Sequence, residues 1–265
     1  MKNILMFAYS IIAYLIGFAS LLLWILSVSQ LVPEISIDRT PELSFPLALI
    51  KNIGLVLLFG LQHSIMARKS FKQWITGLIP QSVERSTFVL LSGILLAFLV
   101  WQWEPLGGTI WNITAGTPLF YILYALFFMG WSILFISTFL INHFDLFGLR
   151  QTYSGLTKKP YTDLPFRVKA FYNYVRHPLY FGGILGLWAT PTMTATHLCF
   201  ALLLTGYFVI GSLFEEKDLV RDFGDQYQDY QKRTGRFVPL FSRNKTITSS
   251  AADKAGREAS LTEAD

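Results

Sequence analysis

The chain has 265 residues, of which 52% are hydrophobic and only 15% charged, and its mean hydropathy is +0.43. This balance excludes an ordinary soluble domain and indicates an integral membrane protein. The net charge of +5 does not indicate nucleic-acid binding, because the basic residues are concentrated in particular loops. The single cysteine, Cys199, lies inside an apolar run, which excludes a disulfide framework and a cysteine-rich metal site.

The first two apolar runs, residues 4–28 and 45–66, are each long enough to cross a bilayer. The first run is too long for the core of a signal peptide, so we interpret it as a retained crossing. Residues 33–42 carry three acids and one base, whereas residues 67–85 carry four bases and one acid. Because Lys and Arg are enriched in cytoplasmic loops, residues 33–42 are predicted outside and residues 67–85 inside.

Two further crossings are predicted at residues 86–103 and 118–141. The turn between them, residues 104–108, contains no base and suits the external side. Residues 142–176 contain six bases and two acids, which predicts a second cytoplasmic loop. Three tryptophans near the external side are expected in an interfacial belt: Trp101, Trp103 and Trp111.

The last apolar stretch is broken only at Thr194–Thr196. His177 lies 18 residues before Ala195 and Glu215 lies 20 residues after it, so a helical hairpin returns both to one level of the membrane. The predicted fold is therefore an all-α transmembrane helical bundle with five to six crossings and both termini in the cytoplasm. Its closing hairpin is expected to form a pocket at the cytoplasmic face.

The domain organisation follows from the same composition. Residues 1–241 are predicted to form one membrane domain, within which no further boundary is evident. Residues 242–265 are rich in Ala, Ser, Thr and charged residues without apolar periodicity. Such a segment cannot bury enough apolar surface to fold, so we expect a disordered cytoplasmic tail.

The stretch from Tyr174 to Gly183 combines a cation, an imidazole, a proline and a glycine pair at the start of an apolar run. Pro178 has no backbone N–H and disfavours a helical conformation for His177. The helix is therefore predicted to begin at Pro178, with His177 as its cap. Backbone groups at this cap are free to face a ligand.

Three of the four histidines, His63, His143 and His177, fall at predicted cytoplasmic helix ends. For any one of them, an interfacial histidine bonded to water is the simplest interpretation. Three on one face, together with two glutamates and several arginines, favour a functional site, because ionisable groups are costly in membranes. His197 lies at the predicted external tip of the hairpin and is expected to be an exposed turn residue. No zinc-binding spacing of histidines is present, so no metal is expected.

Glu215 and Glu216 are adjacent, so on a helix their side chains point about 100° apart and cannot form a paired acid and base. One of them is free to bind a ligand hydroxyl or ammonium while the other anchors a helix. A solvated helix end is the alternative interpretation.

Residues 176–180, Glu215–Glu216 and the tail 236–239 together resemble the C-terminal signature of the isoprenylcysteine carboxyl methyltransferase and phospholipid methyltransferase superfamily. This resemblance implies a membrane enzyme that binds S-adenosylmethionine at the cytosolic face. It also implies which residues line the cofactor site: Tyr174, Val175, His177, Pro178, Tyr180, Gly182, Glu215 and Glu216.

Residues 61–68, 83–87 and 141–151 resemble the bacterial methanethiol S-methyltransferases, and NnrU-like membrane proteins share part of this pattern. The resemblance implies methylation of methanethiol to dimethyl sulfide by a protein of the bacterial inner membrane, surrounded by lipid. Two alternatives remain open. One is a methyltransferase for a prenylcysteine carboxylate or a lipid amine, and the other is a non-enzymatic NnrU-like membrane protein.

A thiol becomes a strong nucleophile only as its thiolate, so the site needs a proton acceptor or a cationic environment. His143 is the first candidate for the base, and His63 is the alternative. Asp145 could orient a protonated His143, but only if the helix ends near Asn142, because residues two apart on a helix diverge. Arg150 or Arg85 could supply positive potential.

Overall fold

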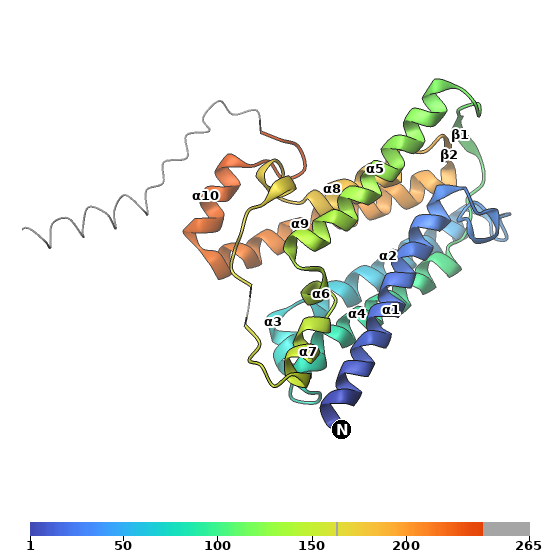
Figure 1. Ribbon diagram of the computed structural model, residues 1–265. Coiled ribbons are helices and arrows are strands. Elements are labelled where there is room, and N and C mark those ends of the chain that lie inside the picture. Colours follow the sequence, from blue (N-terminus) through green and yellow to red (C-terminus); the bar gives the residue numbers. More distant parts are fainter. Residues whose placement is uncertain (163, 241–265) are drawn as a thin grey trace, which may run out of the picture.

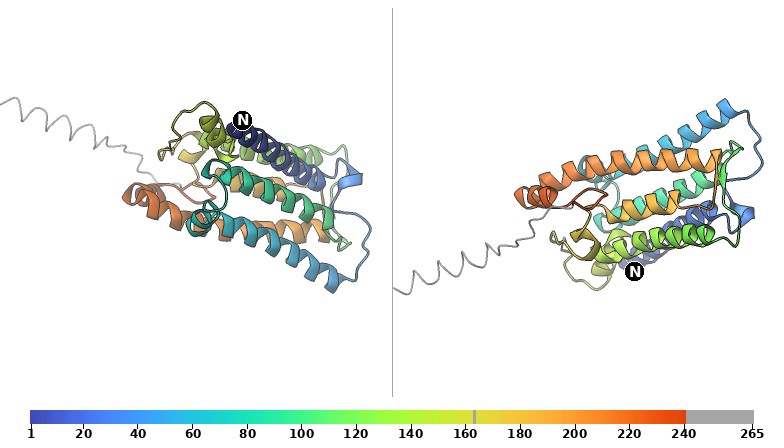
Figure 2. Two further views of the ribbon diagram at one scale, coloured as in Figure 1. Left: turned by 90° about the horizontal axis from the view of Figure 1, so that it is seen from below. Right: turned by 90° about the horizontal axis from the view of Figure 1, so that it is seen from above.

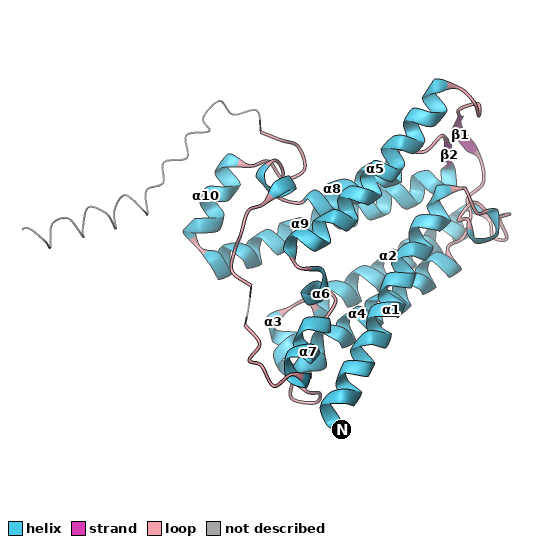
Figure 3. Cartoon of the chain, viewed as in Figure 1, coloured by secondary structure: helices cyan, strands magenta, loops and turns pink. Residues whose placement is uncertain are grey.

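The computed structural model describes residues 1–162 and 164–240, and the predicted tail lies outside the described residues. Helices account for most of the described chain (Figure 3). Five helices are long and apolar enough to span a membrane: α1 (Lys2–Ser29), α2 (Phe45–Met66), α4 (Gln81–Gln102), α5 (Pro118–Ile141) and α9 (Ala195–Phe223). The prediction of an all-α transmembrane bundle is therefore confirmed.

Shorter elements complete the described chain. The short helices are α3 (Lys69–Ile75), α6 (His143–Leu146), α7 (Leu149–Leu156), α8 (Pro178–Trp188) and α10 (Asp225–Arg233). Two 3₁₀ turns, η1 (Pro33–Ile35) and η2 (Ala170–Asn173), and two strands, β1 (Thr109–Asn112) and β2 (Thr192–Thr194), are also present. The last predicted hairpin is thus formed by α8, β2 and α9. With 11 residues, α8 extends about 16 Å and cannot cross a bilayer core of about 30 Å unaided.

The helices form two groups that lie side by side (Figures 1 and 2). One group contains α1, α2 and α4, and the other contains α5, α8 and α9. Helices α1 and α8 begin, and α2, α5 and α9 end, at what we call the polar end of the bundle, where His63, His143 and His177 lie. The opposite end, which carries β1 and β2, is called the sheet end.

Close packing of small residues holds each group together. A Cβ added to Gly93 of α4 would lie 2.7 Å from Gly17 Cα of α1. A Cβ added to Gly182 of α8 would lie 2.5 Å from the carbonyl oxygen of Gly130 in α5. Helices in lipid associate through such close backbone approach, because burying apolar surface gains little when the solvent is itself apolar. These contacts set the position of α8, and hence of the His177 cap.

Two expectations at the sheet end are wrong. His197 is fully buried, and its Nε2 lies 2.8 Å from the carbonyl oxygen of Leu187. Trp103 is also buried, whereas Trp101 is exposed. The physical reason is that β1 pairs antiparallel with β2 and covers the hairpin tip, and Gln30 donates a further hydrogen bond to the Thr192 carbonyl.

An ion pair between Lys51 and Glu104 stabilises the same end of the bundle. Lys51 Nζ lies 2.9 Å from Glu104 Oε2, and the backbone N–H groups of Glu42 and Leu43 donate to Glu104 Oε1. The buried Asn52 side chain exchanges two hydrogen bonds with the backbone of Glu104. These bonds tie α2 to the segment that follows α4, and they explain how polar residues are accommodated near the outer end of an apolar run.

Candidate active site

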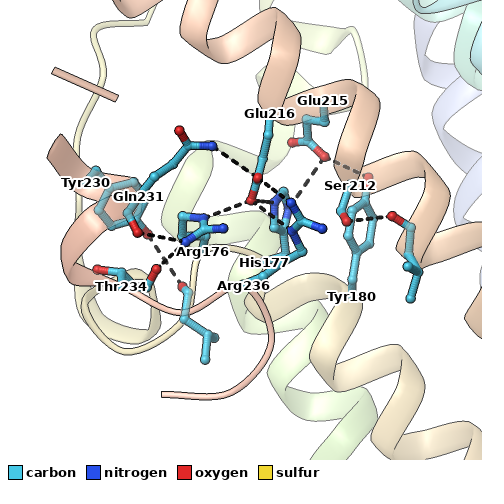
Figure 4. Close-up of polar contacts among 12 residues, drawn as sticks. Arg176, His177, Tyr180, Ser212, Glu215, Glu216, Tyr230, Gln231, Thr234 and Arg236 are labelled. Carbon is cyan, nitrogen blue, oxygen red and sulfur yellow. Dashed lines mark hydrogen bonds and ion pairs between the residues drawn. The ribbon is translucent and has the colours of Figure 1, made fainter. Parts of the chain in front are cut away.

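The C-terminal end of α9 carries a buried carboxylate that is fully occupied by hydrogen bonds (Figure 4). Glu216 Oε1 accepts from Arg176 Nε at 2.8 Å, His177 Nε2 at 3.0 Å and Arg236 Nε at 3.2 Å. Its Oε2 accepts from Arg236 Nη2 at 2.7 Å and Gln231 Nε2 at 3.1 Å. We call this set of five residues the Glu216 clamp. A buried carboxylate is tolerated only with such compensation, so the clamp joins α8, α9, α10 and the segment after α10.

The backbone reinforces the clamp. Val175 forms a parallel bridge with Gly235, and the N–H groups of Arg176 and His177 donate to the carbonyls of Gly235 and Arg236 at 2.8 and 3.1 Å. The Arg176 guanidinium also donates to the Gln231 carbonyl at 3.1 Å. The segment after α10 is therefore part of the site, which agrees with its inclusion in the sequence motif.

His177 caps α8, as predicted, with φ −123° and ψ 64° immediately before Pro178. Its ring is buried and stacks on Tyr180 with centroids 5.3 Å apart, and Tyr180 stacks in turn on Phe208 at the same distance. The imidazole therefore contacts Glu216 and Tyr180, and its Nδ1 lies 3.7 Å from Glu215 Oε2. This arrangement rigidly positions the start of α8.

Glu215 and Glu216 differ sharply in environment. Glu215 is 47% exposed and accepts one hydrogen bond, from Tyr180 Oη at 2.8 Å, whereas Glu216 is 5% exposed. The sequence predicted that one glutamate anchors a helix and that the other is free to bind a ligand. The structure shows that Glu216 is the anchor and that Glu215 is open.

The remaining residues of the expected cofactor set lie around this pair. Tyr174 is exposed and Val175 is buried. Pro178 and Gly182 are buried within α8, and the nearest atoms to a Cβ on Gly182 belong to α5. Gly182 therefore has a packing role between α8 and α5, whichever residues contact a ligand.

His143 occupies an aromatic enclosure and is 2% exposed. Its ring stacks on Phe139 with centroids 4.2 Å apart. Nδ1 lies 2.8 Å from Thr138 Oγ1, and Nε2 lies 3.1 Å from Tyr14 Oη. Thr138 Oγ1 donates its own hydrogen to the Phe135 carbonyl, so Nδ1 carries the ring proton and Tyr14 donates to Nε2. Burial lowers the pKa of His143, which favours the neutral ring.

Asp145 does not contribute to this arrangement. Helix α5 ends at Ile141 and Asn142 adopts φ 161° and ψ 98°, so the helix break required by the sequence argument is present. Asp145, however, binds Arg150 Nη1 at 2.9 Å and Tyr161 Oη at 3.1 Å. The His143 ring forms its hydrogen bonds with Tyr14 and Thr138 instead, and neither residue was identified in the sequence. The contact with Tyr14 depends on the tertiary packing of α1, and no local motif marks it.

His63 and Arg85 form a second group at the polar end. Both contact Phe88: the His63 ring centroid is 4.8 Å from that of Phe88, and Arg85 Cζ lies 4.7 Å from it. His63 Nδ1 is 2.8 Å from Tyr207 Oη. Arg85 Nε donates to the Leu146 carbonyl at 2.7 Å. Three expected residues, His63, His143 and His177, are thus at one end, but each has a different environment.

A cavity of about 460 Å³ opens between α1 and the segment from α6 to α7. None of the residues of the Glu216 clamp lines this cavity. Its lining is mainly apolar and consists of Phe7, Ile11, Asn142, Phe144, Leu149, Arg150 and Tyr153. Among the described residues, no group of three or more His, Cys, Asp or Glu side chains is placed to hold a metal ion.

Comparison with known proteins identifies relatives that cover most of the chain. The chain is 49% identical over 210 residues to a methanethiol S-methyltransferase of Crocosphaera subtropica, a match covering 78% of this chain and 81% of that protein. It is 41% identical over 241 residues to a methanethiol S-methyltransferase of Mycobacterium tuberculosis, covering 90% and 98%. Nurim of Bos taurus is 29% identical over 181 residues, covering 64% and 68%. No family model and no solved structure matches the chain.

Proposed function

The chain belongs to the methanethiol S-methyltransferase family, and from this we propose that it methylates methanethiol with S-adenosylmethionine, giving dimethyl sulfide and S-adenosylhomocysteine. Relatives of that name match 78 to 90% of this chain at 41 to 49% identity. We further propose that the protein resides in the bacterial inner membrane with its polar end and both termini in the cytoplasm. The excess of basic residues in the loops at the polar end supports this orientation.

The residues around Glu215 fit S-adenosylmethionine, which carries sulfonium and ammonium cations and an adenine ring. The observation that supports this most directly is the open carboxylate of Glu215, which is 47% exposed and holds one hydrogen bond from Tyr180. An exposed carboxylate beside aromatic rings attracts cations through both charge and ring faces. We propose that Glu215, Tyr180 and Tyr174 contact the cofactor, while Val175, His177, Pro178, Gly182 and Glu216 shape the site behind them.

When bound, S-adenosylmethionine supplies a methyl group activated by a positively charged sulfur. The chain itself must orient the acceptor, favour its thiolate and exclude water. The Glu216 clamp contributes rigidity, because it holds α8, α9 and the segment after α10 in one arrangement. Methanethiol is small and apolar and partitions into lipid, which gives a physical reason for placing such an enzyme in a membrane.

The test is headspace gas chromatography of dimethyl sulfide from the full chain in lipid nanodiscs supplied with S-adenosylmethionine and methanethiol. Glu215→Gln is expected to lower S-adenosylmethionine affinity about tenfold, the effect of losing one charge-assisted contact. Glu34→Gln, an exposed glutamate at the sheet end, is the matched control and is expected to bind like the wild type. Affinity is measured by equilibrium dialysis.

Two results would overturn the proposal. Binding of S-adenosylmethionine without formation of dimethyl sulfide would mean that the acceptor is a different molecule, such as a prenylcysteine carboxylate or a lipid amine. Absence of both binding and product would favour a non-enzymatic membrane protein.

A further inference from the structure

We propose that Arg85 and His63 form the binding site for the methyl acceptor, in which Arg85 binds the substrate sulfur as a thiolate and His63 accepts the proton that the thiol loses. This inference rests on the proposed function and assigns the acceptor site within it. It replaces His143 and Arg150, the other candidates from the sequence, by residues whose reactive atoms are available.

The guanidinium of Arg85 keeps its charge and most of its donors. Only its Nε is used, in the 2.7 Å hydrogen bond to Leu146, and no carboxylate of the described residues forms an ion pair with it. Arg150 differs, because Asp145 lies 2.9 Å from its Nη1 and its Nη2 donates to the Thr162 carbonyl. A cation that is already neutralised stabilises a thiolate poorly, so Arg85 is the better partner for an anion.

Three acids act on Arg85 through their charge, first Glu84, its neighbour on α4, and then Asp145 and Glu215, and none of them forms an ion pair with Arg85 among the described residues. Asp145 instead accepts from Arg150 and Tyr161, and Glu215 accepts from Tyr180. These acids explain how an arginine is tolerated at a helix end in a membrane, while its two Nη groups remain free for a small anion.

His63 has a ring nitrogen available, and His143 has none. Nδ1 of His63 contacts Tyr207, whereas Nε2 has no hydrogen-bond partner among the residues that the structure describes. In the tautomer in which Nδ1–H donates to Tyr207, Nε2 carries a lone pair and can accept a proton. Both nitrogens of His143 are occupied by Thr138 and Tyr14, and its ring is almost fully enclosed.

The same part of α9 connects this pair to the proposed cofactor site. Tyr207, which contacts His63, precedes Phe208, which stacks on Tyr180. Tyr180 in turn donates to Glu215. An acceptor at Arg85 and His63 would therefore lie near the proposed donor site, as direct methyl transfer requires.

In the proposed step, His63 Nε2 takes the proton of the thiol, and the sulfur electron pair that remains, held by Arg85, forms the new bond to the methyl carbon. The bond from that carbon to the sulfonium breaks, and its electron pair leaves a neutral thioether. The proton on His63 is released to water afterwards. Charge balances, because one sulfonium and one neutral thiol give two neutral thioethers and one proton.

Several titratable groups surround the pair and shape its pH dependence. They are Glu84, Asp145, Tyr161 and Glu215 around Arg85, Tyr207 beside His63, and Lys72 on α3. Burial, followed by the charge of Arg85, lowers the pKa of Lys72.

The direct test measures the protonation state of the acceptor without turnover. Carbon-labelled methanethiol is titrated with pH by NMR in the nanodisc-embedded protein loaded with S-adenosylhomocysteine. In the wild type, the pKa of the bound thiol is expected about 1 to 3 units below that of free methanethiol. Arg85→Gln is expected to abolish this shift and Arg85→Lys to retain part of it. Arg221→Gln, a surface arginine on α9, is the control and is expected to retain all of it.

Kinetics separate the two residues. Arg85→Gln and His63→Gln are each expected to lower kcat/KM about 100-fold. His63→Gln should also remove the fall of kcat/KM at acidic pH, whereas His143→Asn should leave the shape of that profile unchanged. An unchanged thiol pKa and kcat/KM in Arg85→Gln, with a wild type that makes dimethyl sulfide, would overturn this inference alone. A wild type that makes no dimethyl sulfide would instead overturn the proposed function.

Discussion

Gly148 and Ser86 are in such close contact that a Cβ on Gly148 would lie 2.6 Å from Ser86 Oγ. Gly148 has φ +86°, a conformation that glycine adopts without strain, and its carbonyl accepts a hydrogen bond from Ser86 at 3.1 Å. Ser86 Oγ also lies 2.7 Å from Ser10 Oγ, so the single hydroxyl hydrogen of Ser86 is shared between these two acceptors. This contact fixes the loop between α6 and α7 on α4, directly beside Arg85.

Gly148→Ala is expected to destabilise the protein by more than about 1 kcal/mol, because it adds both strain and a clash. It should also disturb the Leu146 carbonyl that orients Arg85 and so lower kcat. The control is Gly155→Ala in α7, where a Cβ meets nothing within 4 Å and φ is not positive. Thermal unfolding in nanodiscs compares the two, and equal Tm values would contradict the role assigned to Gly148.

Glu216→Gln is expected to lower the free energy of unfolding by roughly 3 to 5 kcal/mol, because it leaves Arg176 and Arg236 without their buried counter-charge. Glu215→Gln should change stability little, since Glu215 is half-exposed and accepts a single hydrogen bond. Chemical unfolding of both variants measures the difference. If Glu215→Gln were the more damaging for stability, the division between anchor and open glutamate would be wrong.

Glu104 is expected to make the sheet end sensitive to acid. Although burial alone would raise its pKa, hydrogen bonds from Lys51, Glu42 and Leu43 hold the pKa of Glu104 below its ordinary value of 4.5. A carboxyl with a depressed folded-state pKa contributes stability above its unfolded pKa, and this is lost as the pH falls through the folded-state pKa. Glu104→Gln should therefore be less stable than the wild type at neutral pH, and the gap in Tm should close below pH 4.5. A gap that is the same at every pH would argue against this role.

His143 is expected to make the polar end sensitive to acid in the same direction, but at a higher pH. Because burial lowers the pKa of His143 below its ordinary value of 6.5, protonation favours the unfolded chain, and stability falls as the pH drops below 6.5. His143→Asn should be less stable than the wild type at pH 8, since it loses the Thr138 and Tyr14 contacts, but should lose less on acidification. Tm measured across this pH range tests the difference. A steeper acid loss in the variant would exclude the buried neutral ring.

Much of the fold could be predicted from the sequence because bilayer thickness sets helix length. The four separate apolar runs and the second arm of the predicted hairpin became the five long helices, whereas the first arm became the shorter α8, which begins at Pro178 as predicted. Counting residues from Ala195 at the hairpin tip placed His177 level with the two glutamates, and the 3.0 Å hydrogen bond between His177 and Glu216 confirms this. The prediction for His197 was wrong, because the pairing of β1 with β2 that buries it joins segments about 80 residues apart.

The site was only partly predictable. The adjacent glutamates on one helix had to diverge, but which of them is buried depends on Arg236 and Gln231, which approach from the segment after α9. Likewise, the sequence placed three histidines at one end of the bundle, but it did not show which of their ring nitrogens lack a hydrogen-bond partner. Nε2 of His143 is hydrogen-bonded to Tyr14, which is 129 residues away in the chain. Nδ1 of His63 is hydrogen-bonded to Tyr207, which is 144 residues away.

The sequence by itself thus determined the membrane class, the crossings and the end of the bundle where polar groups gather, because these depend on composition and run length. Only the tertiary structure decided which of these polar groups already have hydrogen-bond partners and which remain available to a ligand. Hydrogen bonds and ion pairs form between side chains that distant helices bring together, and that depends on how small residues such as Gly130 and Gly182 let the helices approach.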